Sequence, residues 1–422
     1  MCSLGELFEI GAGKTMSAAA RDGDNKTPFL RTSNVFWDEI DLSSVDEMSI
    51  PAAELEGKLL RAGDLLVCEG GDIGRAAVWN GEAETMSFQN HLHRLRPRVW
   101  DVVPRFYVFF LQSGFTQLGL FEGAGNKTTI PNLSRNRLAA LEVPKPDHSE
   151  QSQIVAVLSR VREAIKMNER SLTAARDLKR ASMSALFTRG LRGEAQKESE
   201  IGGLPLSWDV VPLGSLGRVG NGSTPKRTVH EYWRSGAYPW LTSAKMYDRE
   251  ISEADEFVTE AALRECHLPK LEPGTILIAI TGQGKTLGHC AVLRTRATIN
   301  QHVAYITVDQ NRVDSSFVRG YLETQYDYLR QVGSGGGSTK GALTCTFLRG
   351  MPIPLPPTIE EQQEISTVLD ASDRKIDLHR RKRAVLDELF KSLLHKLMTG
   401  ETRITDLDLS AFAPTSVSGA AA

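Results

Sequence analysis

One segment of the chain approaches the residue types and spacing of a phosphate-binding loop, with Ala279 in place of the leading glycine. Residues 279–286, with the sequence AITGQGKT, match a relaxed phosphate-loop pattern and follow a strand-like apolar run. In such a loop the backbone N–H groups surround the phosphates, while Lys285 would contact the terminal phosphate and Thr286 a magnesium ion. Under this interpretation the chain is a P-loop nucleotide-binding protein that uses Lys285.

The sequence around this segment speaks against a phosphate loop. Residues 287–293 (LGHCAVL) predict a turn and another strand, whereas a phosphate loop opens a helix. No apolar run that ends in aspartate follows to provide a magnesium ligand. A second partial match at residues 11–15 (GAGKT) lacks the leading glycine, because Phe8 occupies that position. We interpret both segments as tight turns that present polar groups, and keep nucleotide binding as an alternative.

Other residue types that carry chemistry form no recognisable set. His91 and His302 lie in similar surroundings, but a lone histidine beside a strand is more typical of a hydrogen-bonded structural residue than of a catalytic base. The five cysteines are scattered and include no Cys-x-x-Cys pair, which argues against a zinc or redox site and favours a reducing cytoplasm. We expect no catalytic residue, no metal site and no cofactor in this chain.

The length and charge of the chain limit its partners. Its 422 residues, 41% of them hydrophobic, are enough for two domains that each bury a core. Lys plus Arg number 50 against 52 for Asp plus Glu, so any nucleic-acid binding must use local patches. Apolar runs such as residues 275–280 have the length of strands, and the start of the chain shows no signal-peptide pattern. We expect a cytoplasmic protein without a membrane segment.

The most informative feature is an internal repeat, which indicates that one module is written twice. The offset between the copies stays near 211 residues, as from His91 to His302. Segments that recur in the same order include 4–7 (LGEL) and 213–216 (LGSL), 63–67 (GDLLV) and 274–278 (GTILI), 143–146 (VPKP) and 353–356 (IPLP), and 150–154 (EQSQI) and 361–365 (EQQEI).

Each copy ends in a pattern that predicts a long helix. Apolar residues recur at a spacing of about 3.5 from Ile154 to Ala185 in the first copy and from Ile365 to Leu397 in the second, which is the seam of a coiled coil. Each pattern covers roughly 40 residues, or about 60 Å of helix. We expect the two helices to pack antiparallel against each other. The alternative is that each helix folds onto its own globular part.

These patterns predict a mixed α/β fold with two tandem globular domains, each followed by a long helix, and with pseudo-twofold symmetry. Short runs rich in Val, Ile and Leu, bounded by Gly, Asn and Pro, predict the strands. The expected boundaries are 1–148 for the first domain, 149–192 for the first helix, 193–206 for a linker, 207–357 for the second domain, 358–400 for the second helix and 401–422 for a flexible tail.

Paired loops in the two copies carry the polar residues best suited to DNA. Lys and Arg hold phosphates, while Arg, Asn and Gln can read base edges. The alternative for any one of these residues is an ordinary solvated loop. The candidates in the first copy are Lys14, Thr15, Arg31, Asn34, Arg75, Asn90, Asn126, Lys127 and Thr128. Those in the second copy are Lys226, Arg227, Lys245, Gln283, Lys285, Thr286, Gln301, Ser338, Thr339 and Lys340.

Taken in order, these motifs resemble the specificity subunit of type I restriction-modification systems. The resemblance covers essentially the whole chain. The motifs that carry it are residues 204–208 (LPLSW) leading to LGSL, the GTILI strand, the glycine turn after it, the NQH stretch at 300–302, the IPLP exit and the EQQEI opening of a long helix. Each motif alone is weak, but the ordered set occurs twice.

The resemblance implies that each domain reads one half of a split, asymmetric DNA sequence and that the antiparallel helices set the distance between the halves. It implies partners: double-stranded DNA, two methyltransferase subunits that bring S-adenosylmethionine chemistry, and restriction subunits that bring ATP- and Mg-dependent translocation. One departure is that LPLSW has no counterpart before residue 4, which leaves the N-terminal boundary of the first domain open. Either this domain is trimmed at its edge, or it completes its packing with the C-terminal region. A coiled-coil adaptor without DNA contact remains a second alternative.

Overall fold

The computed structural model describes residues 1–119, 133–282, 285–334 and 342–407. The chain divides into two compact units. The first unit consists of Met1–Glu169 with the chain from Arg381 onward, and the second of Arg170–Arg380. Each unit is described by itself below.

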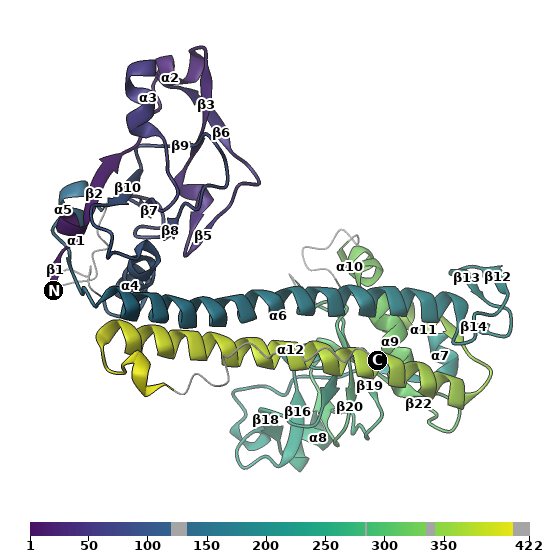
Figure 1. The fold of residues 1–422 in the computed structure, drawn as a ribbon. Coiled ribbons are helices and arrows are strands. Elements are labelled where there is room, and N and C mark those ends of the chain that lie inside the picture. Colours follow the sequence, from purple (N-terminus) through teal and green to yellow (C-terminus); the bar gives the residue numbers. More distant parts are fainter. Residues whose placement is uncertain (120–132, 283–284, 335–341, 408–422) are drawn as a thin grey trace, which may run out of the picture. The chain divides into compact units, whose positions relative to one another are not determined.

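The first unit is built on a four-stranded antiparallel sheet with the order β2-β10-β7-β8, covered by helix α4 (Pro104–Thr116). Within it, Leu95 pairs with Ile10 on one side and Leu65 on the other. A three-stranded sheet, β6-β3-β9, lies beside it (Figure 1). The strands are β2 (Phe8–Ala12), β3 (Lys26–Leu30), β6 (Asp46–Ser49), β7 (Leu65–Cys68), β8 (Ala76–Val78), β9 (Ser87–Phe88) and β10 (Leu92–Pro97).

The shorter elements of the first unit close its edges. Strand β1 (Cys2–Ser3) pairs with β11 (Glu142–Val143), and β4 (Val35–Phe36) pairs with β5 (Glu39–Ile40). The short helices are α1 (Leu4–Leu7), α2 (Ala18–Asp22), α3 (Ala52–Lys58), α5 (Arg135–Ala139) and the 3-10 turn η1 (Thr32–Asn34).

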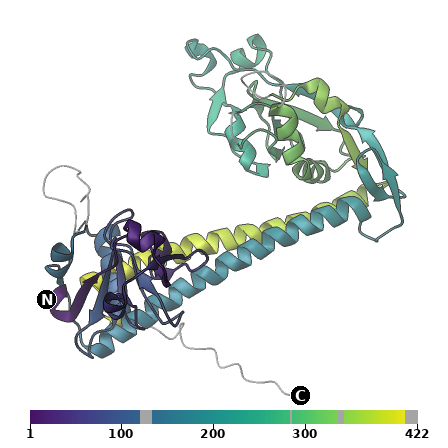
Figure 2. The same ribbon diagram turned by 90° about the horizontal axis from the view of Figure 1, so that it is seen from above.

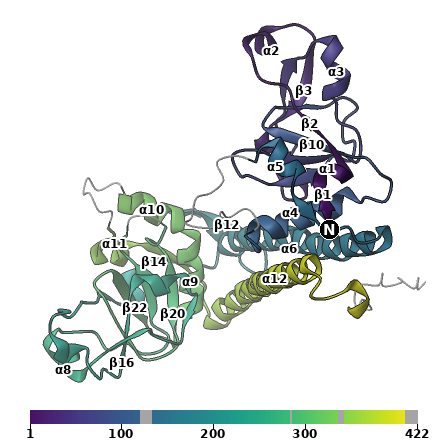
Figure 3. The ribbon, with the colours of Figure 1, turned by 90° about the vertical axis from the view of Figure 1, so that its left-hand side faces the viewer.

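The second unit repeats this strand order with one strand added. Its main sheet has the order β15-β22-β19-β20-β17 and its smaller sheet β18-β16-β21. Strands β22 and β20 of the main sheet and β16 of the smaller sheet are labelled in Figure 3. The strands are β15 (Gly217–Asn221), β16 (Tyr238–Leu241), β17 (Glu250–Ile251), β18 (Glu256–Val258), β19 (Ile276–Ala279), β20 (Cys290–Leu293), β21 (Thr298–Ile299) and β22 (Val303–Val308). The agreement of strand order confirms that the sequence repeat is a repeat of fold.

The remaining elements of the second unit are mostly helical. Strand β14 (Asp209–Pro212) pairs with β23 (Pro352–Leu355), the counterpart of β1 with β11. The helices are α7 (Leu213–Leu216), α8 (Glu260–Glu265), α9 (Ser315–Thr324), α10 (Tyr326–Ser334) and α11 (Cys345–Gly350), with the 3-10 turns η2 (His230–Tyr232) and η3 (Ser243–Tyr247).

Two long helices, α6 (His148–Arg189) and α12 (Ile359–Thr399), contribute to both units. In the first unit, Ile154 and Leu158 share a core with Leu394 and Met398. In the second, Phe187 shares a core with Ile365 and Leu369. Residue numbers rise along one helix as they fall along the other, so the helices pack antiparallel within each unit (Figure 2). This confirms the expected coiled coil and rules out a separate fold for each helix.

The ends of the long helices differ from a simple linker and tail. The predicted linker at 193–206 contains a hairpin, because β12 (Gln196–Ser199) pairs with β13 (Gly202–Pro205). After α12, the 3-10 turn η4 (Ile404–Asp406) places Ile404 in the core of the first unit. The first domain therefore does pack against the C-terminal region. Among the described residues, no helix is long and apolar enough to cross a membrane.

Candidate nucleic-acid interface

In the second unit, several loops meet at one end of the main sheet. Thr224, just after β15, donates its hydroxyl to Oε1 of Gln301. The Nε2 atoms of Gln301 and His302 lie 3.0 Å apart, and Nδ1 of His302 lies 2.5 Å from the Thr281 hydroxyl after β19. Thr281 also forms a β-bridge with Ala342. We call this set of loops the second loop cluster.

The first unit forms the corresponding cluster through its backbone. The N–H of Asn90 donates to the carbonyl of Lys14 at 3.0 Å, and the N–H of Glu69 donates to the carbonyl of His91 at 2.9 Å. Leu133 then donates to the Glu69 carbonyl at 2.9 Å. We call these loops the first loop cluster.

The backbone framework is the same in the two clusters. In the second unit, Ile280 donates to the His302 carbonyl at 2.9 Å and Leu343 donates to the Ile280 carbonyl at 2.8 Å. Both bonds have their counterparts at Glu69 and Leu133. The framework is kept while the exposed side chains differ, which is the arrangement expected of loops that recognise different ligands on one scaffold.

The two histidines differ in their contacts. Both ring nitrogens of His302 have a neighbouring polar side chain, and the His91 carbonyl accepts a backbone hydrogen bond. The side chain of His302 joins the Gln301 and Thr281 loops. The expectation of a hydrogen-bonded structural histidine fits the geometry of His302 better than a catalytic base does, whereas the contact of His91 is made by its backbone and His91 is exposed.

The residues of the first unit that were predicted to contact DNA differ in how accessible they are. Asn34 is 4% exposed, and its amide donates to the carbonyls of Asp41 and Ser44, so it shapes the loop and is not available to a ligand. The ammonium group of Lys14 lies 2.8 Å from the Glu54 carboxylate. The backbone of Lys14 lies in the loop cluster. Thr15, beside it, is exposed.

The two candidate arginines of the first unit both have carboxylate partners. Arg31 lies 2.9 Å from Asp46. Arg75 lies 3.0 Å from Asp72 and its guanidinium group stacks on the Phe36 ring, 5.0 Å from the centroid. These contacts hold the side chains in place at the surface, and a phosphate would compete with the carboxylates for them.

The second unit adds an aromatic support that the sequence did not reveal. The guanidinium group of Arg227 lies 3.8 Å from the centroid of Trp233 and 5.1 Å from that of Trp240, and it pairs with Glu256. The two tryptophans meet edge to face. A pair of tryptophans seven residues apart near two basic residues was the available signal, but only the fold shows that the rings stack under Arg227.

Other cations of the second unit vary in their surroundings. Lys245 pairs with Asp255 at 2.9 Å, whereas Lys226 and Lys285 are exposed. The hydroxyl of Thr286 lies 2.9 Å from that of Tyr247. Several predicted residues lie outside the described part of the chain, namely Asn126, Lys127, Thr128, Gln283, Ser338, Thr339 and Lys340.

The segment that matched a phosphate loop does not open a helix. Thr286 is followed by a turn and then by strand β20, as the sequence predicted. The hydroxyl of Tyr326 donates to the carbonyl of Lys285 at 2.5 Å, so neighbouring aromatic residues fix this turn. Across the described residues, no group of His, Cys, Asp or Glu has the arrangement of a metal site.

Comparison with known proteins identifies the architecture. A family model described as the type I restriction modification DNA specificity domain matches residues 1–175 and again residues 205–388. The chain therefore belongs to the type I restriction-modification specificity family. The two matches correspond to the two copies of the sequence repeat, as the resemblance in the motifs predicted.

Relatives in this specificity family span most of the chain. A Methanocaldococcus jannaschii protein assigned as the specificity subunit of the type I restriction enzyme MjaX is 25% identical over 388 residues, covering 89% of this chain and 87% of its own. The MjaIX specificity subunit of the same organism is 34% identical over 218 residues, covering 49% and 48%. The crystal structure of the M. genitalium type I S subunit shares the fold, with a TM-score of 0.59 at 16% identity, covering 94% of this chain and 95% of that one.

Proposed function

We propose that this chain is the DNA-recognition subunit of a type I restriction-modification complex and that it reads a split, asymmetric sequence, with one half-site for each recognition domain. The observation that supports this is the pair of loop clusters, in which one backbone framework carries two different sets of exposed side chains. The proposed recognition domains are residues 1–148 and 207–357.

The polar side chains fall into two groups, those suited to contact DNA phosphates and those suited to contact base edges. Arginine and lysine neutralise phosphates, whereas amides can make paired hydrogen bonds to an adenine edge. The residues proposed to contact DNA in the first unit are Lys14, Thr15, Arg31, Arg75 and Asn90, and in the second Lys226, Arg227, Lys245, Lys285, Thr286 and Gln301. Asn34 is left out because its amide is buried and engaged.

The chemistry of such a complex would lie in its partners. We propose two methyltransferase subunits, which bring S-adenosylmethionine, and restriction subunits, which bring ATP- and Mg-dependent translocation and cleavage. This chain would act with them in the cytoplasm. Its contribution is to position them on a DNA sequence.

Exchange of the second recognition domain tests the proposal. Residues 207–350 are replaced by the same region of another family member, the chain is expressed with its methyltransferase partners, and the methylated sequence of the host genome is determined. We expect only one half-site to change, because the first loop cluster is untouched. A change in both half-sites, or in neither, would contradict the assignment of one half-site to each domain.

Point variants locate the contact within the second loop cluster. Gln301→Ala removes an amide that can read a base, so we expect about 1–3 kcal/mol less discrimination at one position of the second half-site. Gln310→Ala is the matched control, because Gln310 is an exposed glutamine outside the cluster. Equal effects of the two variants on the methylated sequence would show that the loop cluster does not read DNA.

A further inference from the structure

The apolar seams of α6 and α12 share several residues at equivalent positions. The offset of 211 residues places isoleucine on isoleucine and leucine on leucine, as with Ile154 and Ile365 or Leu158 and Leu369. These residues are buried in both units. Other positions differ, since the offset takes the buried Val161 to Ser372 and the buried Ala175 to Leu386. The shared apolar residues by themselves do not prevent α6 from pairing with a second copy of itself.

A charged contact between the helices of the first unit differs from its counterpart in the second unit. We call the facing residues Arg162 and Phe390, with Asp38 of the recognition domain, the charged layer of the first unit. Arg162 on α6 has a side chain only 13% exposed, and its guanidinium group lies 4.8 Å from the ring centroid of Phe390 on α12. Arg162 also pairs at 2.9 Å with Asp38, a recognition-domain carboxylate that is 3% exposed. The arginine is thus held between an aromatic ring and a buried anion.

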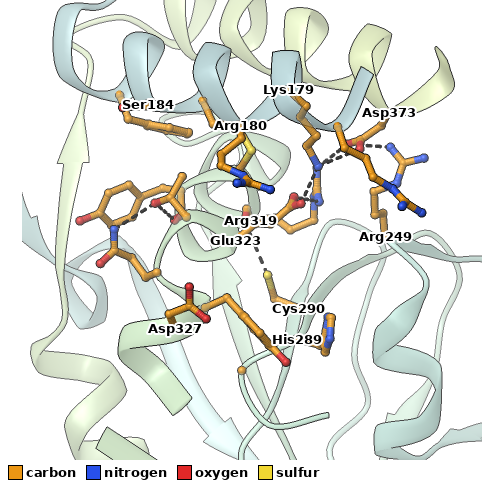
Figure 4. Close-up of a pocket in the computed structure, with 18 of the residues that line it drawn as sticks. Lys179, Arg180, Ser184, Arg249, His289, Cys290, Arg319, Glu323, Asp327 and Asp373 are labelled. Carbon is orange, nitrogen blue, oxygen red and sulfur yellow. Dashed lines mark hydrogen bonds and ion pairs between the residues drawn. The ribbon is translucent and has the colours of Figure 1, made fainter. Parts of the chain in front are cut away.

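The same layer of the second unit has the opposite charge. The 211-residue offset takes Arg162 to Asp373, which is buried on α12. Asp373 pairs with Lys179 on α6 at 2.7 Å and with Arg249 of the recognition domain at 2.7 Å. Figure 4 shows Lys179 and Arg249 converging on Asp373 at one wall of a cleft of about 800 Å³.

The correspondence extends to the recognition-domain partner and to the facing helix residue. The offset takes the acidic Asp38 to the basic Arg249, and Lys179 to the neutral Phe390. The first unit therefore has a recognition-domain anion on a helix cation, and the second has a recognition-domain cation on a helix anion. The neighbouring contacts follow the same signs, since Lys166 pairs with Glu39 and Arg249 also pairs with Asp377.

The consequences for helix pairing follow from register. If two α6 helices paired antiparallel in this register, Arg162 of each would face Lys179 of the other, which places two like charges together in a partly buried layer twice over. If two α12 helices paired, Asp373 would face Phe390 and lose its lysine. Arg162 keeps the Phe109 ring of its own domain and Asp373 keeps Arg249 in any pairing, but only the pairing of α6 with α12 places Phe390 against Arg162 and Lys179 against Asp373.

We propose that the Arg162–Phe390 and Lys179–Asp373 layers select the pairing of α6 with α12 over the pairing of either helix with its own copy. The layers would then ensure that two unlike recognition domains, and not two identical ones, are held together. This inference concerns assembly, and its test below does not use DNA, so its failure would leave the proposed function standing.

A split form of the complete chain tests the selection. The chain is opened at the turn between β12 and β13, and the segments 1–200 and 201–422 are expressed together, the first with two different tags in equal amounts. Native mass spectrometry then counts unlike and like pairs. We expect wild-type segments to form unlike pairs almost exclusively. Like pairs of segment 1–200 in the proportion expected from random association would overturn the proposal.

Two substitutions should reverse the preference, one in each segment. Lys179→Phe gives a pair of α6 helices the favourable arginine-on-ring layer, so we expect the ratio of like to unlike pairs of segment 1–200 to rise roughly tenfold or more. Phe390→Lys gives a pair of α12 helices a contact between Asp373 of one copy and the introduced lysine of the other. It should raise like pairs of segment 201–422 by a similar factor.

The matched control is Arg180→Phe, because it makes the same kind of change at the adjacent residue, which is 83% exposed on its side chain. We expect it to leave the ratio unchanged. If Lys179→Phe impairs folding of the first segment, Phe390→Lys still tests the layer from the other helix. Unchanged ratios for a folded Lys179→Phe or a folded Phe390→Lys, or an equal rise for Arg180→Phe, would contradict selection by this layer.

Discussion

The two units anchor their recognition domains by one contact that is identical and another that is reversed. Gln151 on α6 accepts from the N–H of Val103 at the start of α4, at 2.9 Å. Gln362 on α12 accepts from the N–H of Asp314 at the start of α9, also at 2.9 Å. Both glutamines are almost fully buried. The ion pairs of Arg162 and Asp373, in contrast, have opposite signs in the two units.

The difference separates two kinds of interaction. A side-chain amide that binds backbone groups is indifferent to the sequence of the domain, so the same glutamine can hold either domain at the same place. An ion pair depends on sign, so it can hold one domain and disfavour the other. The glutamine contacts therefore place both recognition domains in the same way on their helices. The ion pairs of Arg162 and Asp373 are specific to one domain each under the proposal above.

The units also differ in how the edge of the core is closed. In the second unit, Trp208 is fully buried, meets Phe317 edge to face at 5.9 Å and donates from its indole to Glu361 at 3.2 Å. In the first unit, the chain beyond α12 places Ile404 in the core instead. The two modules thus share strand order but not the residue that completes their packing.

The largest effect should come from Trp208→Ala, which breaks the second unit alone. Removal of a buried tryptophan costs about 3–5 kcal/mol through lost packing and a residual cavity. We expect faster hydrogen–deuterium exchange in β19 and β22 and little change in β7 and β10, because Trp208 contacts only the core of the second unit. Mass-resolved exchange of the full chain measures both.

Trp100→Ala serves as the control, since Trp100 is 87% exposed and its loss should change exchange in neither sheet. An equal increase of exchange in β7 and β10 after Trp208→Ala would show that the two units do not respond separately. The two units would then unfold as one cooperative structure.

Sequence alone predicted the repeated fold because the repeat can be observed within one chain. The repeated strands follow from motifs such as GDLLV and GTILI, and the helix pair follows from the apolar spacing, whereas the order of the strands within each sheet came from the structure. The prediction that 193–206 is a linker missed the β12–β13 hairpin, since its strands carry no alternating apolar pattern that would distinguish them from a polar connection.

The sequence alone predicted the side chains of the loop clusters less well than it predicted the fold. Asn34 and Asn90 look alike as loop amides, yet the Asn34 side chain is buried against the carbonyls of its own loop and Asn90 is only partly buried in the cluster. The contact of Asp38 with Arg162 joins residues far apart in the chain. No local pattern reveals such a pair, but once it is seen in one unit the 211-residue offset indicates Arg249 and Asp373 in the other.

The glutamine contact that both units share can be removed by the same substitution in each unit. Gln151→Ala and Gln362→Ala each leave a partly buried backbone N–H without its acceptor, and each should cost about 1 kcal/mol. Because the geometry is the same, we expect similar losses, with faster exchange at the start of α4 for the first variant and of α9 for the second. A loss confined to one variant would show that the glutamines are equivalent in position but not in energy.

The smallest effect concerns the pH dependence of the second unit. Burial acts to raise the pKa of Glu323, but the charges of Lys179 and Arg319 outweigh it, and the net pKa lies below the ordinary value of 4.5. A carboxylate with a lowered pKa in the folded state stabilises the protein above pH 4.5, and this contribution is lost as the pH falls through the folded-state pKa.

Glu323→Gln should therefore make the stability of the second unit less sensitive to acid below pH 4.5, where the wild type loses stability. The free energy of unfolding of the two proteins is measured by urea unfolding at several values from about pH 7 to about pH 3.5. Hydrogen–deuterium exchange in β20 and α9 reports on the second unit. Glu253→Gln, a change at an exposed glutamate of the same unit, should follow the wild-type curve. If the Glu323→Gln curve also follows it, the carboxylate adds nothing to the charged cluster, and the difference between the units rests on Asp373, Lys179 and Arg249 alone.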